Sequence, residues 1–130
     1  MIRVADAVRK APAVVALETT LVAHGFPAGE GLAVGLESER RVRAAGAVPA
    51  TVGVLDGEIV VGLSEGELAR FDASARKAGP RDLAPCIAQR AVGATTVGAT
   101  LAVCRTVGIR FMGTGGIGGV HREWQERPHG

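Results

Sequence analysis

The chain has 130 residues, of which 47% are hydrophobic, 22% are charged and only 3% are aromatic. This length and composition predict one globular domain with a core of Val, Leu, Ile and Ala, and they argue against an aromatic stacking surface for nucleic acid. The formal net charge of +2 is likewise too small to indicate a nucleic-acid partner.

Cysteine use and hydropathy indicate the compartment. The longest uncharged segment, residues 91–104, is shorter than a membrane span, and no secretory signal is evident at the start of the chain. Cys86 and Cys104 each lie in an apolar helical pattern and form no C-x-x-C motif. We therefore expect buried free thiols in a cytoplasmic protein with no membrane partner.

The first predicted elements are a helix, a strand and a second helix. Apolar residues at helical spacing predict a short amphipathic helix over residues 1–10, ended by Pro12. The apolar run 13–17 predicts a strand buried on both faces. Residues 29–45 predict a longer amphipathic helix, with Gly46 as its C-terminal stop.

A β-hairpin is predicted next. The runs 49–55 and 58–63 are joined by the Asp-Gly pair at 56–57, a tight-turn signal. Ser64 then begins a short helix as its N-cap, and Glu67 completes a capping box three residues later.

The remaining elements complete a mixed order of helices and strands. They are an irregular or extended segment (72–80), a helix that Asp82 caps (83–91), a loop (93–97), a helix ending at Gly108 (101–107) and a strand (109–112). This order predicts an α/β fold with a mixed, layered sheet and flanking helices.

The densest basic cluster lies in the predicted helix over residues 29–45. Glu37 precedes Arg41 by four residues, and Glu39 precedes Arg43 by four. This spacing favours pairs on a solvated helix face over a nucleic-acid surface.

A glycine-rich loop follows the last predicted strand. Five of the seven residues from 113 to 119 are glycine. A loop so bare of side chains lets backbone N–H groups approach a ligand closely, and phosphate is the usual ligand. Gly113, Gly115 and Gly118 also match the spacing G-x-G-x-x-G, which is a weak signal without a following helix.

Seven segments occur together in a recognisable order. They are residues 14–20 (VVALETT), 23–27 (AHGFP), 46–51 (GAVPAT), 61–64 (VGLS), Lys77 with 81–83 (RDL), 93–97 (GATTV) and 114–122 (TGGIGGVHR). In this set the chain resembles the pseudouridine-5'-phosphate glycosidases, also called the indigoidine synthase A-like family. The resemblance extends from Pro12 to Arg122.

The resemblance implies reversible cleavage of pseudouridine 5'-phosphate to uracil and ribose 5-phosphate, a reaction of nucleoside catabolism. The bond broken is a C–C glycosidic bond, whose leaving carbon has no lone pair to protonate. In the family a lysine forms an imine with the sugar C1', a carboxylate shuttles protons, and bound manganese organises water and polar groups. The resemblance also implies that the full-length protein forms a homo-oligomer, specifically a homotrimer.

The resemblance carries specific roles to matching residues. Glu18 corresponds to the proton donor, and the alternative is a glutamate that caps the following turn. Lys77 corresponds to a substrate-binding lysine, through charge on the phosphate, and the alternative is an ordinary surface lysine. Val97 corresponds to a substrate contact near the backbone, and the alternative is a core valine before a helix.

The glycine-rich loop supplies the other candidate substrate contacts. They are Thr114, Gly115, Gly116 and His121. His121 and His24 could each orient a ligand or transfer a proton, or each could be a structural histidine bonded to backbone. Ser64 is predicted to be a cap and not a nucleophile, because the chain has no G-x-S-x-G motif.

The chain also departs from the family. The family continues past the V-H-R motif with an aspartate-rich segment, which supplies the manganese ligand, and later with the imine-forming lysine. Lys10 and Lys77 are the only lysines here, and neither lies in that lysine motif. We therefore assign no metal ligand in this chain.

These departures predict that residues 1–130 form a single, truncated domain corresponding to the N-terminal part of such an enzyme, with little or no glycosidase activity alone. The alternative is a catalytically inactive remnant that at most binds a sugar phosphate or assembles with an intact copy. A generic nucleotide-binding module ranks last, because it leaves six of the seven segments unexplained.

Overall fold

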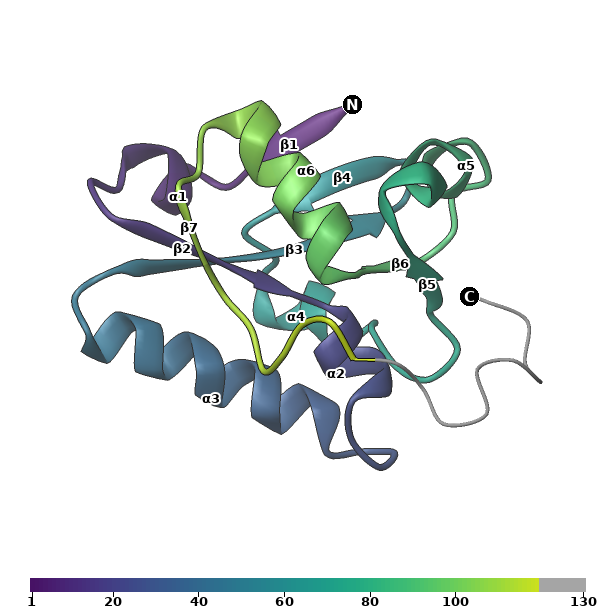
Figure 1. The fold of residues 1–130 in the computed structure, drawn as a ribbon, viewed down its shortest axis with the longest axis horizontal. Helices are drawn as coiled ribbons and strands as arrows, with labels where there is room; N and C mark the ends of the chain where they lie inside the picture. Colours follow the sequence, from purple (N-terminus) through teal and green to yellow (C-terminus); the bar gives the residue numbers. More distant parts are fainter. Residues whose placement is uncertain (120–130) are drawn as a thin grey trace.

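The computed structural model describes residues 1–119 and shows a sheet with helices on both of its faces (Figure 1). The strands are β1 (Ile2–Val4), β2 (Val14–Glu18), β3 (Val48–Leu55), β4 (Glu58–Val61), β5 (Arg76–Ala78), β6 (Gly93–Thr95) and β7 (Phe111–Gly113). The helices are α1 (Asp6–Lys10), α2 (Thr20–His24), α3 (Gly31–Ala44), α4 (Glu65–Leu68), the 3-10 turn η1 (Pro80–Asp82), α5 (Leu83–Ala88) and α6 (Val97–Val107).

The sheet has mixed strand directions. Its main path runs β1-β4-β3-β2-β7, while β6 pairs with β3, and β5 pairs with β6. β2 is parallel to both β3 and β7, whereas β4 and β6 run antiparallel to β3. The predicted mixed α/β fold with flanking helices is confirmed.

β3 is the centre of the core because its side chains are buried on both faces of the sheet. Val52 and Val54 belong to a cluster with residues of α1, α5 and α6. Leu55 belongs to a second cluster, on the opposite face, with residues of α2 and α4. Figure 1 shows the same layering, with α6 on one side of the sheet and α3 on the other.

Three predicted terminators and turns are confirmed. α3 is followed by Gly46 at φ +92°, and α6 ends at Gly108 in the left-handed region, where its N–H donates to the Cys104 carbonyl at 2.8 Å. Positive φ values at Asp56 and Gly57 form the tight turn of the β3–β4 hairpin.

The predicted capping box is also confirmed. The Glu67 N–H donates to Ser64 Oγ at 3.2 Å, and the Ser64 N–H donates to Glu67 Oε1 at 2.9 Å. Ser64 is therefore a helix cap. Asp82, expected to cap the helix that follows it, instead accepts the Gly79 N–H at 2.9 Å and closes η1.

The predicted helix over residues 1–10 is wrong in its first half. Residues 2–4 form β1, which pairs in parallel with β4, and only α1 is helical. The β-branched Ile2 and Val4 pack against a core cluster from this edge strand, so a tertiary partner overrides the helical spacing.

The predicted loop over residues 93–97 is also wrong. Gly93 to Thr95 form β6, a fully buried strand, and α6 begins at Val97, four residues earlier than expected. A Cβ at Gly93 would lie 3.0 Å from that of Val54, so only a very small residue fits beside β3. The Thr96 hydroxyl accepts the Ala99 N–H at 3.2 Å and caps α6.

The acidic and basic residues of α3 pair as predicted, with one correction. Glu37 contacts Arg41 at 3.1 Å, and Glu39 contacts Arg43 at 3.5 Å. Glu39 is not solvated, however: it is 6% exposed and accepts the Thr51 hydroxyl at 2.6 Å. This buried acceptor ties α3 to β3.

The two cysteines are buried and free, as predicted. Within residues 1–119, no helix has the length and hydropathy to cross a membrane.

Candidate active site

The C-terminal ends of four strands converge beside Val52 of β3. β2 ends with Glu18 opposite Val52, and β6 arrives from the other direction with Ala94 opposite Gly53. β7 ends alongside β2, and β5 ends alongside β6. Since ligands of α/β sheets bind beyond the carboxyl ends of strands, this convergence is the candidate site.

Buried threonine hydroxyls hold the meeting strand ends together. Thr19 Oγ1 donates to the Val52 carbonyl at 2.8 Å, and Thr95 Oγ1 donates to the same carbonyl at 2.7 Å. The Thr95 N–H donates to Thr19 Oγ1 at 2.8 Å, and Thr100 Oγ1 donates to Thr95 Oγ1 at 2.9 Å. All three threonines are fully buried, so β2, β3, β6 and α6 are fixed to one another at this point.

Glu18 projects from the end of β2 and contacts the glycine-rich loop. Thr114 Oγ1 donates to Glu18 Oε1 at 2.5 Å, and the Gly116 N–H donates to Thr114 Oγ1 at 3.2 Å. Glu18 is half-buried, and within residues 1–119 it makes no bond to the first turn of α2. The capping alternative is therefore wrong, and Glu18 Oε2 has no hydrogen-bond partner among these residues.

Packing explains few of the glycines in the loop after β7. A Cβ at Gly115 would lie 3.5 Å from Leu21, an ordinary contact, and one at Gly116 would meet nothing within 4 Å. Gly118, at φ +76°, is the one described position of the loop proper where the backbone itself favours glycine. The backbone at 116 therefore faces open space, which leaves room for a ligand beside this part of the loop.

Lys77 and Val97 lie on the two other converging elements. Lys77 is exposed on β5, one residue before its end, and makes no ion pair within the described residues. Val97 is the first residue of α6, whose first turn has unpaired N–H groups and the positive end of the helix dipole. The structure gives no direct contact between either residue and Glu18.

The two candidate site histidines, His24 and His121, differ in what the structure shows of them. His24 Nε2 lies 2.9 Å from the Ala75 carbonyl oxygen, so His24 is a structural histidine bonded to backbone. His121 lies outside the described residues.

Thiol and metal chemistry find little support in residues 1–119. Burial raises the pKa of the Cys104 thiol, which makes a poor nucleophile. No three His, Cys, Asp or Glu side chains of this part of the chain gather to hold a metal ion. A cavity of about 20 Å³ beside Glu18 and Thr51 has room for a single water, so a substrate would approach Glu18 from the open side.

The threonine network is the part of the site that sequence reasoning missed. The sequence does carry one signal of this network, a pair of adjacent threonines where a strand ends. One pair, 19–20, directly follows β2, and the other, 95–96, begins with the last residue of β6. Thr20 follows the same logic, because its hydroxyl donates to the Ala94 carbonyl at 3.1 Å. Short β-branched hydroxyls suit this position, since each satisfies a backbone group where a strand leaves the sheet.

Comparisons with known proteins show which family the chain belongs to. A profile of the family described as indigoidine synthase A like protein matches residues 3–128. Relatives named pseudouridine-5'-phosphate glycosidase include one from Streptomyces griseus, 55% identical over 115 residues, and one from Arabidopsis thaliana, 47% identical over 123 residues. These matches cover 87% and 92% of this chain, but 36% and 37% of the relatives. The chain thus spans less than two fifths of their length.

Two solved structures share the fold. An indigoidine synthase A-like protein from Thermotoga maritima has a TM-score of 0.81 and 36% identity, and the match covers 93% of this chain and 41% of that one. The prealnumycin C-glycosynthase AlnA, solved in complex with ribulose 5-phosphate, has a TM-score of 0.73 and 36% identity, covering 97% and 42%. Family profile, relatives and fold agree: this chain belongs to the indigoidine synthase A-like protein family.

Proposed function

We propose that this chain supplies the carboxylate side of a pseudouridine-5'-phosphate glycosidase site, in which Glu18 is the proton donor. The observation that carries the proposal is the position of Glu18. It lies where four strand ends converge, in contact with Thr114 of the glycine-rich loop. The names of the relatives supply the substrate, pseudouridine 5'-phosphate, and the family resemblance implies the products, uracil and ribose 5-phosphate.

The chemistry follows from the bond that is cleaved. When the C–C glycosidic bond breaks, the base carbon that loses the sugar must gain a proton. Thr114 holds one oxygen of Glu18, which leaves the other oxygen to face the substrate and deliver that proton. The family's imine-forming lysine would open the sugar and accept its electrons, and we infer that this amine comes from outside the motifs present here.

Phosphate binding completes the proposal. The Gly115 N–H and the first turn of α6 at Val97 offer donors for an anion, and Lys77 adds positive charge. His121 is proposed as a further contact from the same loop. No three possible metal ligands gather within residues 1–119, so manganese would need further ligands, and none of the steps proposed here uses it.

A chimera tests the role of Glu18. In it, this chain replaces the matched 115 residues of the Streptomyces griseus relative. The chimera should release uracil from pseudouridine 5'-phosphate, and Glu18→Gln should lower kcat by about 10²–10⁴. The matched control is Glu30→Gln, an exposed residue before α3, which should leave kcat unchanged. Equal rates for the Glu18→Gln and parent chimeras would refute the assignment.

A second function, an inactive sugar-phosphate binder, is favoured by the position of the lysines. Lys10 ends α1, beside the start of β2 and so at the opposite end of that strand from Glu18. Borohydride trapping with ribose 5-phosphate tests whether the chain alone holds an imine-forming lysine. We expect no covalent adduct by mass spectrometry, and an adduct on Lys77 would instead show that this chain holds its own imine lysine.

A further inference from the structure

The free edges of the sheet differ in how well they are protected against pairing with a strand of another chain. β1 carries Arg3, which pairs with Glu58 at 3.0 Å and also with Glu67. β5 carries the exposed Arg76 and Lys77. Charged side chains on edge strands prevent unwanted pairing with another chain. Both of these edges are protected in that way.

β7 lacks this protection. It pairs only with β2, and its three residues are Phe111, Met112 and Gly113, none of them charged. Phe111 is 65% exposed, a high value for a phenylalanine in a strand. The nearest charge, Arg110, precedes the strand. The outer edge of β7 is therefore free and apolar within the described part of the chain.

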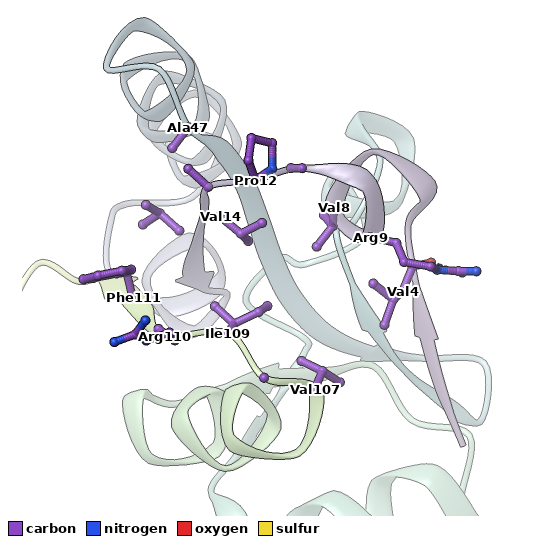
Figure 2. A pocket seen from close by; sticks show the side chains of 14 residues that line it. Val4, Val8, Arg9, Pro12, Val14, Ala47, Val107, Ile109, Arg110 and Phe111 are labelled. Carbon is purple, nitrogen blue, oxygen red and sulfur yellow. Dashed lines mark hydrogen bonds between the residues drawn. The ribbon is translucent and has the colours of Figure 1, made fainter.

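An apolar pocket adjoins the same strand. It has a volume of about 600 Å³ and lies between the end of α1, the start of β2 and the segment from α6 into β7. Its apolar side chains include Val8, Val14 and Ile109, while the heads of Arg9 and Arg110 point away from its centre (Figure 2). The pocket is a gap in the helical layer that covers this face of the sheet.

The longer relatives indicate what fills this gap. This chain aligns with only 41% of the Thermotoga maritima chain, at a TM-score of 0.81. About three fifths of that relative thus lies outside the match. The edges of β1 and β5 carry charges, so the β7 edge is the described edge best suited to a further strand, and the pocket to a further helix.

We propose that the β7 edge and the adjoining pocket bind a polypeptide equivalent to the remaining three fifths of a family member, which adds a strand beside β7. The partner is recognised by backbone pairing to β7 and by apolar side chains that enter the pocket. This inference concerns assembly, so it stands or falls separately from the role of Glu18.

Co-expression tests the docking directly. The tagged full chain is produced with the part of the Streptomyces griseus relative that follows its matched 115 residues. We expect a soluble complex of one copy each by light scattering, and new hydrogen-exchange protection at the amides of residues 111–113.

Two matched variants test whether the partner binds at β7 and the adjoining pocket. Phe111→Glu should weaken binding by about tenfold or more. Leu101→Glu, which replaces a 51% exposed residue of α6 outside the pocket lining, should leave affinity unchanged. Both variants alter exposed side chains, so each should keep the parent's unfolding transition, which is recorded alongside.

Three results would overturn the proposal. These are the absence of a complex, an equal loss of affinity in both variants, and a homodimer through β7 that the added segment does not displace. The last result would identify a second copy of this chain as the occupant.

Discussion

The Val52 carbonyl shows how single hydroxyls fix the candidate site. It accepts from both Thr19 and Thr95, while Thr100 in turn donates to Thr95. All of these groups are fully buried, so no water can replace a lost partner. Glu18 directly precedes Thr19, and the position of its carboxylate therefore depends on this network.

Thr95→Val tests the network at residue scale. The substitution keeps the side-chain shape but removes the hydroxyl, leaving Thr100 without its acceptor and Val52 with one donor fewer. We expect the free energy of unfolding in urea to fall by about 1–3 kcal/mol. Thr106→Val is the matched control, because the Thr106 hydroxyl bonds to the Ala102 carbonyl on the exposed side of the same helix. If Thr106→Val lowered the free energy of unfolding as much as Thr95→Val, the stabilising role of the buried threonine network would be contradicted.

Sequence reasoning located Glu18 and Thr114 but not what holds them. The apolar run 13–17 predicted the strand, and the family resemblance singled out Glu18 after it and Thr114 in the glycine-rich loop. Thr19 and Thr95 were visible as letters in two segments, yet their partners lie 33 and 43 residues away in the chain. Such contacts follow from the meeting of β2 and β6, which local patterns do not encode.

At the scale of elements, β6 shows why local patterns failed. Gly93 and Ala94 have low strand propensity, and both are fully buried against β3. Val54 and Cys86 lie so close to the backbone of β6 that only a very small residue fits at Gly93. Tertiary packing, and not local propensity, therefore determines this strand. α3, the hairpin and α6 were predictable because their terminators are local: Gly46, residues 56–57 and Gly108.

The packing of Phe71 on β3 gives a test at this scale. A Cβ on Gly53 would lie 2.7 Å from Phe71 Cε1, and the ring is only 3% exposed, so it has little room to move. Gly53→Ala should therefore lower the free energy of unfolding by about 1–3 kcal/mol. Gly66→Ala in α4 is the control: nothing lies within 4 Å of its Cβ, and alanine should stabilise this helix by about 0.5–1 kcal/mol. Thermal and urea unfolding of both variants would show opposite signs, and a neutral Gly53→Ala would refute the tight contact.

At the scale of the whole molecule, ion pairs join elements that the core alone does not connect. Arg70 contacts Asp56 at 2.8 Å and so ties the segment after α4 to the hairpin turn. Arg3 links β1 to α4 through Glu67. Each pair sits at the surface, where its contribution is small and screened by salt. Together they join the turn of the β3–β4 hairpin and the strand β1 to α4 and the segment after it.

These pairs predict a loss of stability in acid. The Arg70 guanidinium lowers the pKa of Asp56. Burial raises the pKa of Glu67, but the Ser64 N–H and Arg3 lower it by more, so its pKa also ends below the ordinary value. Since both pKa values are lowered in the folded state, their contribution is complete above the ordinary values of 3.8 and 4.5, and it is lost as the pH falls through the lower folded values.

We therefore expect the contribution of these pairs to the free energy of unfolding to be constant at neutral pH and to fall below about pH 4.5. Urea unfolding at several pH values from 7 to 3 measures it. The double variant Asp56→Asn with Glu67→Gln should be less stable than the parent at pH 7 and should lose less as the pH falls. Asparagine tolerates the positive φ of Asp56, so backbone strain does not confound the comparison. If the double variant lost as much free energy of unfolding in acid as the parent, the acid sensitivity would belong to other carboxylates. One of these is Glu37, whose pKa is lowered by Arg40 and Arg41.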